Sequence, residues 1–313
     1  MQVPGPERRT TRGQIVRRAA VGVAAGMVAT GWRSQRVARA RDRVVVIGAG
    51  VAGLTCAYRL LQHGVHAPVY EASDRVGGRT RTLRGFFAGG QIVEQSGEAI
   101  DTGQHAVRRL VAALGLHLDD TFADTPGRLR SNRFDFHGRR YTYARARRDF
   151  EAVYPALQRD LRAFARSPRA ARELDEMSAA DWIGSRVPGG NGSQLGRLIG
   201  EAYCSEGGVP IEAGSALAVI TQLGESAKRP LSLYGDSDER FKVHGGADQI
   251  AGRVARRLPA GAVAMGMPLV GLRRNADRSY TCAFAGEHSD TDQQGYIDGA
   301  VRTGERAARE LIA

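Results

Sequence analysis

The stretch Val44-Val45-Val46-Ile47-Gly48-Ala49-Gly50-Val51-Ala52-Gly53 decides the fold of this 313-residue chain. Its four β-branched residues in a row predict a short strand that is buried on both faces, as in a parallel sheet. The three glycines then follow at G-x-G-x-x-G spacing, which permits a tight turn, close approach of a pyrophosphate and close packing of the next helix. The stretch therefore predicts a dinucleotide-binding strand, turn and helix.

The helix after these glycines is visible as a periodic pattern. Leu54, Ala57, Tyr58 and Leu61 repeat at the spacing of one helical face, and Gly64 supplies a stop. The helix N-terminus would present free N–H groups and roughly half a positive charge to a phosphate. An ordinary Gly-rich turn is the alternative, and the joint presence of strand, turn and helix favours the dinucleotide interpretation.

A second strand is predicted at 66–71, and it ends in an acid. Glu71 lies 23 residues after Gly48, where a carboxylate accepts hydrogen bonds from the ribose hydroxyls and disfavours a 2′-phosphate. A solvated glutamate at a strand end is the alternative interpretation, and the paired spacing favours the ribose contact.

The residues that follow resemble a known family. Glu71-Ala72-Ser73-Asp74-Arg75-Val76-Gly77-Gly78-Arg79-Thr80-Arg81-Thr82 contains every element of E-A-x-x-R-x-G-G-R-x-x-T, a pattern of the FAD-dependent amine oxidases, which include monoamine and L-amino-acid oxidases. The segment 94–101 is similar to the family's loop over the flavin ring, with Ser96-Gly97 where two glycines are common. The resemblance implies FAD as the cofactor.

The C-terminal part carries a second strong resemblance. Phe284-Ala285-Gly286-Glu287-His288-Ser289, followed by the segment 295–308, is similar to the family pattern F-A-G-E-H-T…G-Y-M-x-G-A-x-x-S-G-x-R-A-A. The resemblance implies a loop on the diphosphate and a helix N-terminus aimed at the flavin. Tyr296 matches the aromatic residue that flanks the amine, which makes it the candidate catalytic residue.

The resemblance implies FAD contacts from several separate segments. Leu269, which follows Pro268, would hold the adenine edge through its backbone. No metal is expected, because Cys56, Cys204 and Cys282 have no metal-ligand spacing. The implied cofactor-binding residues are Gly48, Gly50, Ala52, Gly53, Glu71, Ala72, Arg79, Gly97, Glu98, Leu269, Gly286, Glu287 and Ile297.

The predicted fold class is α/β. We expect a Rossmann-like FAD-binding domain in two parts, residues 41–130 and 238–313, and a mostly helical substrate-domain insert at 131–237. The insert is expected to be truncated, because the chain passes from the strand near Val270 almost directly to the motif at Phe284. Longer family members build the second half of the substrate domain there, with the second aromatic residue and a lysine near the flavin.

Two functions follow from this resemblance. The first is an FAD-dependent oxidase that converts a primary amine or L-amino acid to an imine while oxygen becomes hydrogen peroxide; a hydride equivalent would pass to flavin N5. The second is a catalytically impaired or inactive FAD-binding relic with an internal deletion. An apolar face of the insert would then lose its cover, which predicts possible self-association.

The positive charge of the chain is concentrated in its first 40 residues and does not predict nucleic-acid binding. Net charge is +12, and residues 1–40, with eight arginines and one acid, contribute +7 of it. The remainder shows no basic stripe with interleaved aromatic residues, so nucleic-acid binding is not predicted.

The N-terminal segment 1–40 is predicted to be a signal. Arginines at 8–18 precede an apolar run, 19–32, and Ala38-Arg39-Ala40 gives a cleavage pattern. The run is shorter than the about 20 residues of a membrane span, so no stable span is expected. Arg17-Arg18 resembles a twin-arginine signal and predicts an exported, periplasmic or secreted, protein; a disordered basic tail on a cytoplasmic protein is the alternative.

Overall fold

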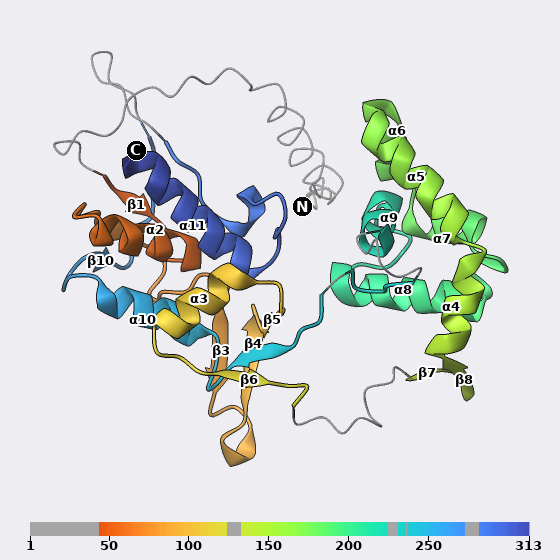
Figure 1. Cartoon of the computed structure of the whole chain (residues 1–313), viewed down its shortest axis with the longest axis horizontal. Coiled ribbons are helices and arrows are strands. Elements are labelled where there is room, and N and C mark those ends of the chain that lie inside the picture. The colour runs from red at the N-terminus through yellow and green to blue at the C-terminus, as the bar shows by residue number, and fades with distance from the viewer. Residues whose placement is uncertain (1–43, 124–132, 225–230, 236, 273–281, 313) are drawn as a thin grey trace, which may run out of the picture. The chain divides into compact units, whose positions relative to one another are not determined.

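The computed structural model describes residues 44–123, 133–224, 231–235, 237–272 and 282–312. These residues form two compact units. We call the one within Arg33–Thr125 and Asp238–Ala313 the sheet unit, and the one within Pro126–Ser237 the helical unit. The sheet unit is assembled from two separate parts of the chain, whereas the described part of the helical unit is continuous in sequence apart from its gaps (Figure 1).

A three-stranded parallel sheet opens the sheet unit. Its strands are β1 (Val46–Ile47), β2 (Val69–Tyr70) and β10 (Val263–Ala264), in the order β1-β2-β10. Val69 lies opposite both Val46 and Val263, so the three strands are in register. Two parallel neighbours joined through a helix are the expected arrangement for a βαβ unit, and the α/β fold class is confirmed.

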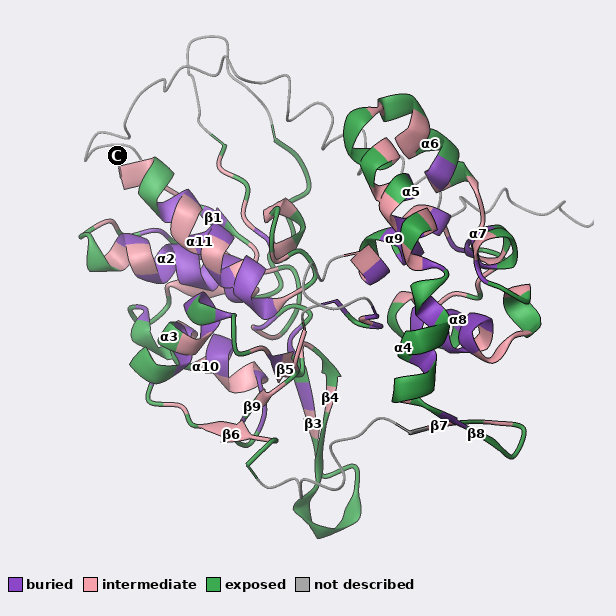
Figure 2. Cartoon of the chain, turned by 45° about the vertical axis from the view of Figure 1, so that its right-hand side comes forward, coloured by how far each residue is buried: buried purple, intermediate pink, exposed green. Residues whose placement is uncertain are grey.

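Helices α2 (Val51–Gln62), α10 (Asp248–Arg257) and α11 (Ile297–Ile312) pack with this sheet around one core. The buried residues lie on the faces where these helices meet, while the opposite helix faces are exposed (Figure 2). Leu54 and Leu60 of α2 and Val301 of α11 are fully buried there. The periodic pattern predicted for α2 is confirmed.

The prediction that the first strand is buried on both faces is wrong. Val46 is buried, but the side chains of Val45 and Ile47 are 49% and 51% exposed. Alternate residues of a strand point to opposite faces, so β1 has one face on the core and one face open. The β-branched run therefore reports strand propensity here and not burial of both faces.

The rest of the sheet unit is antiparallel. A hairpin joins β3 (Arg81–Arg84) to β4 (Ile92–Ser96), with η1 (Ala88–Gly90) between them. Besides the parallel sheet and this hairpin, the unit has a three-stranded antiparallel sheet with the order β5-β9-β6. Helix α3 and the short helix η4 complete the unit. These elements are β5 (Ala99–Ile100), α3 (His105–Ala113), β6 (Leu118–Asp120), β9 (Phe241–Val243) and η4 (Glu287–Ser289).

The helical unit has its own core around Trp182, which is fully buried. The indole N–H of Trp182 donates to the buried carboxylate of Asp160 at 2.9 Å, and Arg186 also contacts that carboxylate. The prediction of a mostly helical segment is confirmed. Its elements are β7 (Arg133–Phe136), β8 (Arg139–Thr142), α4 (Tyr143–Glu151), α5 (Tyr154–Arg166), α6 (Pro168–Glu176), α7 (Ala179–Arg186), η3 (Gly190–Gly192), α8 (Gln194–Gly207) and α9 (Ala216–Gly224).

Among the described residues, none of the helices is both long and apolar enough to cross a membrane. The predicted signal segment, 1–40, lies outside the described residues.

Candidate dinucleotide site

A cavity of about 270 Å³ lies at the carboxyl end of β1 in the sheet unit. Segments far apart in sequence line it: the turn after β1, the second Gly-rich loop before β3, the end of β4, and the residues around the start of α11. The lining residues are Ile47, Gly48, Gly50, Val51, Ala52, Gly53, Gly77, Gly78, Arg79, Thr80, Ser96, Gly97, Ala285, Gly286, Glu287, His288, Gly295, Tyr296, Ile297 and Ala300.

The first glycine turn has the geometry that its spacing predicts. Gly48 has φ +97°, a conformation that residues with a side chain rarely adopt. A Cβ placed on Gly53 would lie 2.1 Å from the carbonyl oxygen of Gly48, so only glycine lets α2 start this close to β1. The N-terminus of α2 consequently opens on the cavity, where its first N–H groups and its dipole favour an anion.

Glu71 stands at the end of β2 and is tied to the same turn. One carboxylate oxygen accepts the N–H of Ala49 at 2.7 Å, and the other accepts the N–H and the hydroxyl of Ser73. Partial burial acts to raise the pKa of Glu71, but the hydrogen bonds from Ser73 and Ala49 outweigh it, and the net pKa lies below the ordinary value. The carboxylate is thus charged and oriented next to the cavity rim.

An ion pair joins two residues of the cavity lining. Arg79, from the second Gly-rich loop, places a guanidinium nitrogen 2.5 Å from a carboxylate oxygen of Glu287. The other carboxylate oxygen of Glu287 accepts the N–H of Gly295 at 2.5 Å. Burial acts to raise the pKa of Glu287, but the bonds from Gly295 and Arg79 leave it lowered.

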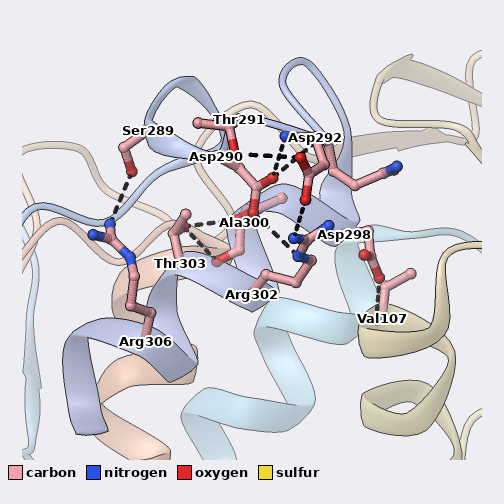
Figure 3. A network of polar contacts seen from close by, with 12 residues as sticks. Val107, Ser289, Asp290, Thr291, Asp292, Asp298, Ala300, Arg302, Thr303 and Arg306 are labelled. Atoms are coloured by element: carbon pink, nitrogen blue, oxygen red, sulfur yellow. Dashed lines mark hydrogen bonds and ion pairs between the residues drawn. The ribbon is translucent and has the colours of Figure 1, made fainter. Parts of the chain in front are cut away.

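The N-terminus of α11 forms another part of the cavity wall. Tyr296, Ile297 and Ala300 line the cavity there. Asp298, which follows Ile297, is turned into the protein and is only 3% exposed. Its carboxylate accepts the N–H of Val107 at 2.7 Å (Figure 3). Burial raises the pKa of Asp298. This carboxylate therefore anchors α11 to α3 and does not face the cavity lining.

The structure gathers most of the residues that the sequence predicts for cofactor binding. Ten line the cavity, with Tyr296 among them: Gly48, Gly50, Ala52, Gly53, Arg79, Gly97, Gly286, Glu287, Tyr296 and Ile297. Glu71 and Ala72 follow β2 and are not among the lining residues, although the carboxylate of Glu71 accepts the N–H of Ala49 in the turn.

Two predicted residues lie elsewhere. Glu98 is turned to Lys242 of β9, with 2.5 Å between its carboxylate and the ammonium group. Leu269 has a side chain that is 58% exposed and does not line the cavity. Its segment follows β10 without forming a further strand up to residue 272, but it is tied to the end of β2: the N–H of Met267 donates to the carbonyl oxygen of Glu71 at 2.8 Å, and the N–H of Gly266 donates to that of Ser73 at 2.9 Å.

Several lining residues were not singled out from the sequence. Gly77 and Gly78 stand in the second Gly-rich motif, and their position in it was the available signal. Ser96, His288 and Gly295 likewise stand in the family motifs, whereas Thr80 falls at an unspecified position of its motif and carried no sequence signal of its own.

The residues present fit a dinucleotide. At Gly48 and Gly50 an added Cβ would meet no atom within 4 Å, so the backbone there faces open space of the kind that a diphosphate fills. Two helix N-termini and Arg79 supply positive potential, and Glu71 supplies an acceptor for hydroxyl groups.

Comparison with known proteins decides the family. The family model described as flavin containing amine oxidoreductase matches residues 51–283, which is most of the chain. The chain belongs to this family. FAD is accordingly its cofactor.

Two curated relatives match parts of this chain. A Mycobacterium tuberculosis protein named after the flavin-containing monoamine oxidases, AofH, is 33% identical over 157 residues, 45% of this chain and 32% of the relative. The L-amino-acid oxidase of Bungarus fasciatus is 41% identical over 81 residues, 26% of this chain and 16% of the relative.

A solved structure gives the same family resemblance over a longer stretch. A triple mutant of putrescine oxidase matches with a TM-score of 0.54 and 25% identity, over 72% of this chain and 51% of that protein. The chain thus spans about half the length of this solved relative, and the curated alignments cover less.

Proposed function

We propose that the cavity holds the diphosphate and adjoining ribose of FAD. Its support is the convergence of the turn at Gly48–Gly53, the loop at Arg79 and the segment 286–297 on one cavity, with Glu71 at the end of β2. In this arrangement the N-terminus of α2 and Arg79 meet the negative charge of the diphosphate, and Glu71 accepts the ribose hydroxyls.

The proposed reaction is oxidation of a primary amine or an L-amino acid to an imine. FAD held here would supply a two-electron acceptor, so that the two electrons and two protons that the amine loses would end on oxygen as hydrogen peroxide. The protein's part is to orient the substrate, for which Tyr296 supplies an aromatic wall, and to supply the positive end of α11 next to the cofactor. The names of the relatives favour these two substrate classes.

One experiment separates binding from turnover. The purified chain is incubated with FAD and desalted, and its absorbance spectrum is recorded. A retained and shifted flavin spectrum is expected, and its absence would contradict cofactor binding. Peroxide release is then followed with a panel of primary monoamines, diamines and L-amino acids; release with one class above a flavin-only control would identify the substrate class.

A second candidate is FAD binding without appreciable turnover. The observation that favours it is that, among the described residues around the proposed diphosphate site, Tyr296 is the one Phe, Tyr or Trp that could flank an amine. A single aromatic surface orients an amine less strictly than two, and the cost in rate is large for small misplacements. A flavin spectrum without peroxide release on the whole panel would decide for this candidate.

We further propose self-association and export. Large apolar side chains such as Phe86 (75%) and Phe284 (72%) are exposed in the sheet unit, which favours association between copies. Light scattering across a tenfold range of protein concentration tests this, since a constant monomer mass would contradict it.

The proposal of export depends on the sequence of residues 1–40.

A further inference from the structure

The segment 284–293, which we call the wall loop, supplies four neighbouring residues of the cavity wall, Ala285 to His288. It contains η4 and runs along the side of α11. Figure 3 shows that side chains from one region of α11 reach this loop at several points. Three of these side chains, Arg302, Thr303 and Arg306, were not singled out from the sequence.

Thr303 holds the start of the wall loop. Its side chain is buried, and its hydroxyl oxygen accepts the N–H of Gly286 at 3.0 Å. The same hydroxyl donates to the carbonyl oxygen of Gly299 at 2.8 Å, one turn earlier in α11. A backbone N–H of a cavity-lining residue is thereby satisfied by the helix and does not face solvent.

Arg302 holds the end of the wall loop. Its guanidinium lies 3.2 Å from the carboxylate of Asp290 and 2.7 Å from the carboxylate of Asp292. Asp290 in turn accepts the N–H groups of Asp292 and Gln293. The side chain of Asp290 is only 6% exposed, so this contact is screened less by solvent than a surface ion pair.

Arg306 adds two contacts, one at the first residue of the wall loop and one in its middle. It donates to the carbonyl oxygen of Phe284 at 2.7 Å. It also donates to the hydroxyl of Ser289 at 3.4 Å (Figure 3). Both bonds leave the same terminal nitrogen, Nη2, which carries two N–H donors, so one group holds two points of the loop.

Gly299 makes the close approach possible. A Cβ at this position would lie 2.1 Å from the carbonyl oxygen of Gln293 and 3.2 Å from Asp290. The absence of a side chain therefore lets the end of the wall loop lie directly against the first turn of α11.

We propose that Arg302, Thr303 and Arg306 are positioning residues that fix the wall loop for cofactor binding. By holding the loop at both ends, they keep Glu287 where it meets Arg79 and Gly295 on the cavity wall. The inference rests on the proposed function, because it assigns these residues an effect on the affinity for FAD.

The test compares Thr303→Val, Thr303→Ser, Arg302→Met and Arg302→Lys in the full chain. Arg309→Met, an exposed arginine on the same helix, is the matched control. Asp292→Asn weakens the Arg302 contact from the loop side and leaves α11 unchanged, which covers the case that a helix variant does not fold. For each protein three quantities are measured: the Kd for FAD, the hydrogen exchange of the wall-loop amides without FAD, and the urea midpoint.

Loss of one such contact should weaken FAD affinity by about 3- to 10-fold, since a net hydrogen bond is modest in strength. Thr303→Ser should restore affinity to within about twofold, because the hydroxyl is kept. Arg302→Lys should stay weak, since an ammonium cannot bridge Asp290 and Asp292 as a guanidinium does. Exchange at Gly286 should rise in Thr303→Val, with α2 unchanged.

Three results would overturn the inference. Unchanged exchange of the wall loop in Thr303→Val and Asp292→Asn would show that these contacts do not fix it. Faster exchange with an unchanged Kd would show that the loop position does not matter for FAD. A loss of affinity equal in Arg309→Met would assign it to general destabilisation. If the wild-type chain bound no FAD, the proposed function would fail, and the link from these residues to FAD affinity would fail with it.

Discussion

Arg79 and Glu287 are 208 residues apart in sequence and 2.5 Å apart in space. Their ion pair joins the second Gly-rich loop to the wall loop. Arg79 is largely exposed, with 72% of its side chain accessible, whereas Glu287 is only 14% exposed. Glu287 is thus the fixed partner, held also by Gly295, and Arg79 is the partner that can turn toward an incoming anion.

The pH dependence of stability should reflect Glu287. Its pKa is lowered in the folded chain, so its contribution to the free energy of unfolding is fully present above the ordinary glutamate pKa of about 4.3 and is lost as pH falls through the lowered value. We expect Glu287→Gln to reduce this acid limb, which urea unfolding at a series of pH values from 7 downward measures. An identical acid limb in the variant would show that another group governs it.

Glu71 should contribute to FAD affinity through the ribose. Glu71→Ala removes the acceptor that Ala49 and Ser73 now orient, and the hydroxyls that it would bind are left unpaired. The expected loss is on the order of 1–3 kcal/mol of binding free energy. Isothermal titration with FAD measures it. FAD affinity that Glu71→Ala leaves unchanged would remove Glu71 from the site.

Replacing Gly53 by alanine, the smallest residue with a side chain, should lower the free energy of unfolding. In Gly53→Ala the new Cβ would meet the carbonyl oxygen of Gly48, and overpacking of this kind costs about 1–3 kcal/mol of unfolding free energy. Gly252→Ala in α10 is the matched control. Its Cβ would have only an ordinary contact of 3.6 Å with Arg256, so a gain of about 0.4–1 kcal/mol is expected. Urea unfolding of both variants checks the contrast, and equal effects would contradict the geometry of the turn.

Tyr296 should affect substrate turnover more than cofactor binding. Tyr296→Leu removes the aromatic wall while the neighbouring N-terminus of α11 stays in place. We expect lower kcat/KM for amine oxidation, FAD affinity within about twofold, and recovery in Tyr296→Phe because the ring is retained. Parallel peroxide assays and FAD titrations measure both. Equal loss in the Phe and Leu variants would assign the effect to the hydroxyl.

The mature N-terminus should lie near Arg41. This prediction comes from the arginines, apolar run and Ala-x-Ala pattern of residues 1–40. Mass spectrometry of protein from the cell envelope or medium of an expressing bacterium measures the terminus, with an Arg17→Lys, Arg18→Lys double variant to test the twin-arginine route. An intact Met1 on exported protein would contradict cleavage.

The sequence by itself determined the dinucleotide turn and the family. Glycine spacing, the distance from Gly48 to Glu71 and the pattern around Arg79 depend on backbone conformation and local chemistry, which a few adjacent residues fix. For the same reason the periodic pattern of α2 identified its buried face.

Tertiary structure alone decided the exposure of β1 and the residues that hold the wall loop. The β-branched run shows that β1 is a strand, but whether a second layer covers Val45 and Ile47 depends on segments far along the chain. The partnership of Arg79 with Glu287, and of Thr303 with Gly286, likewise arises only when distant segments pack together. A local sequence pattern does not predict which distant donor and acceptor will form a hydrogen bond, because the path of the whole chain decides which segments come into contact.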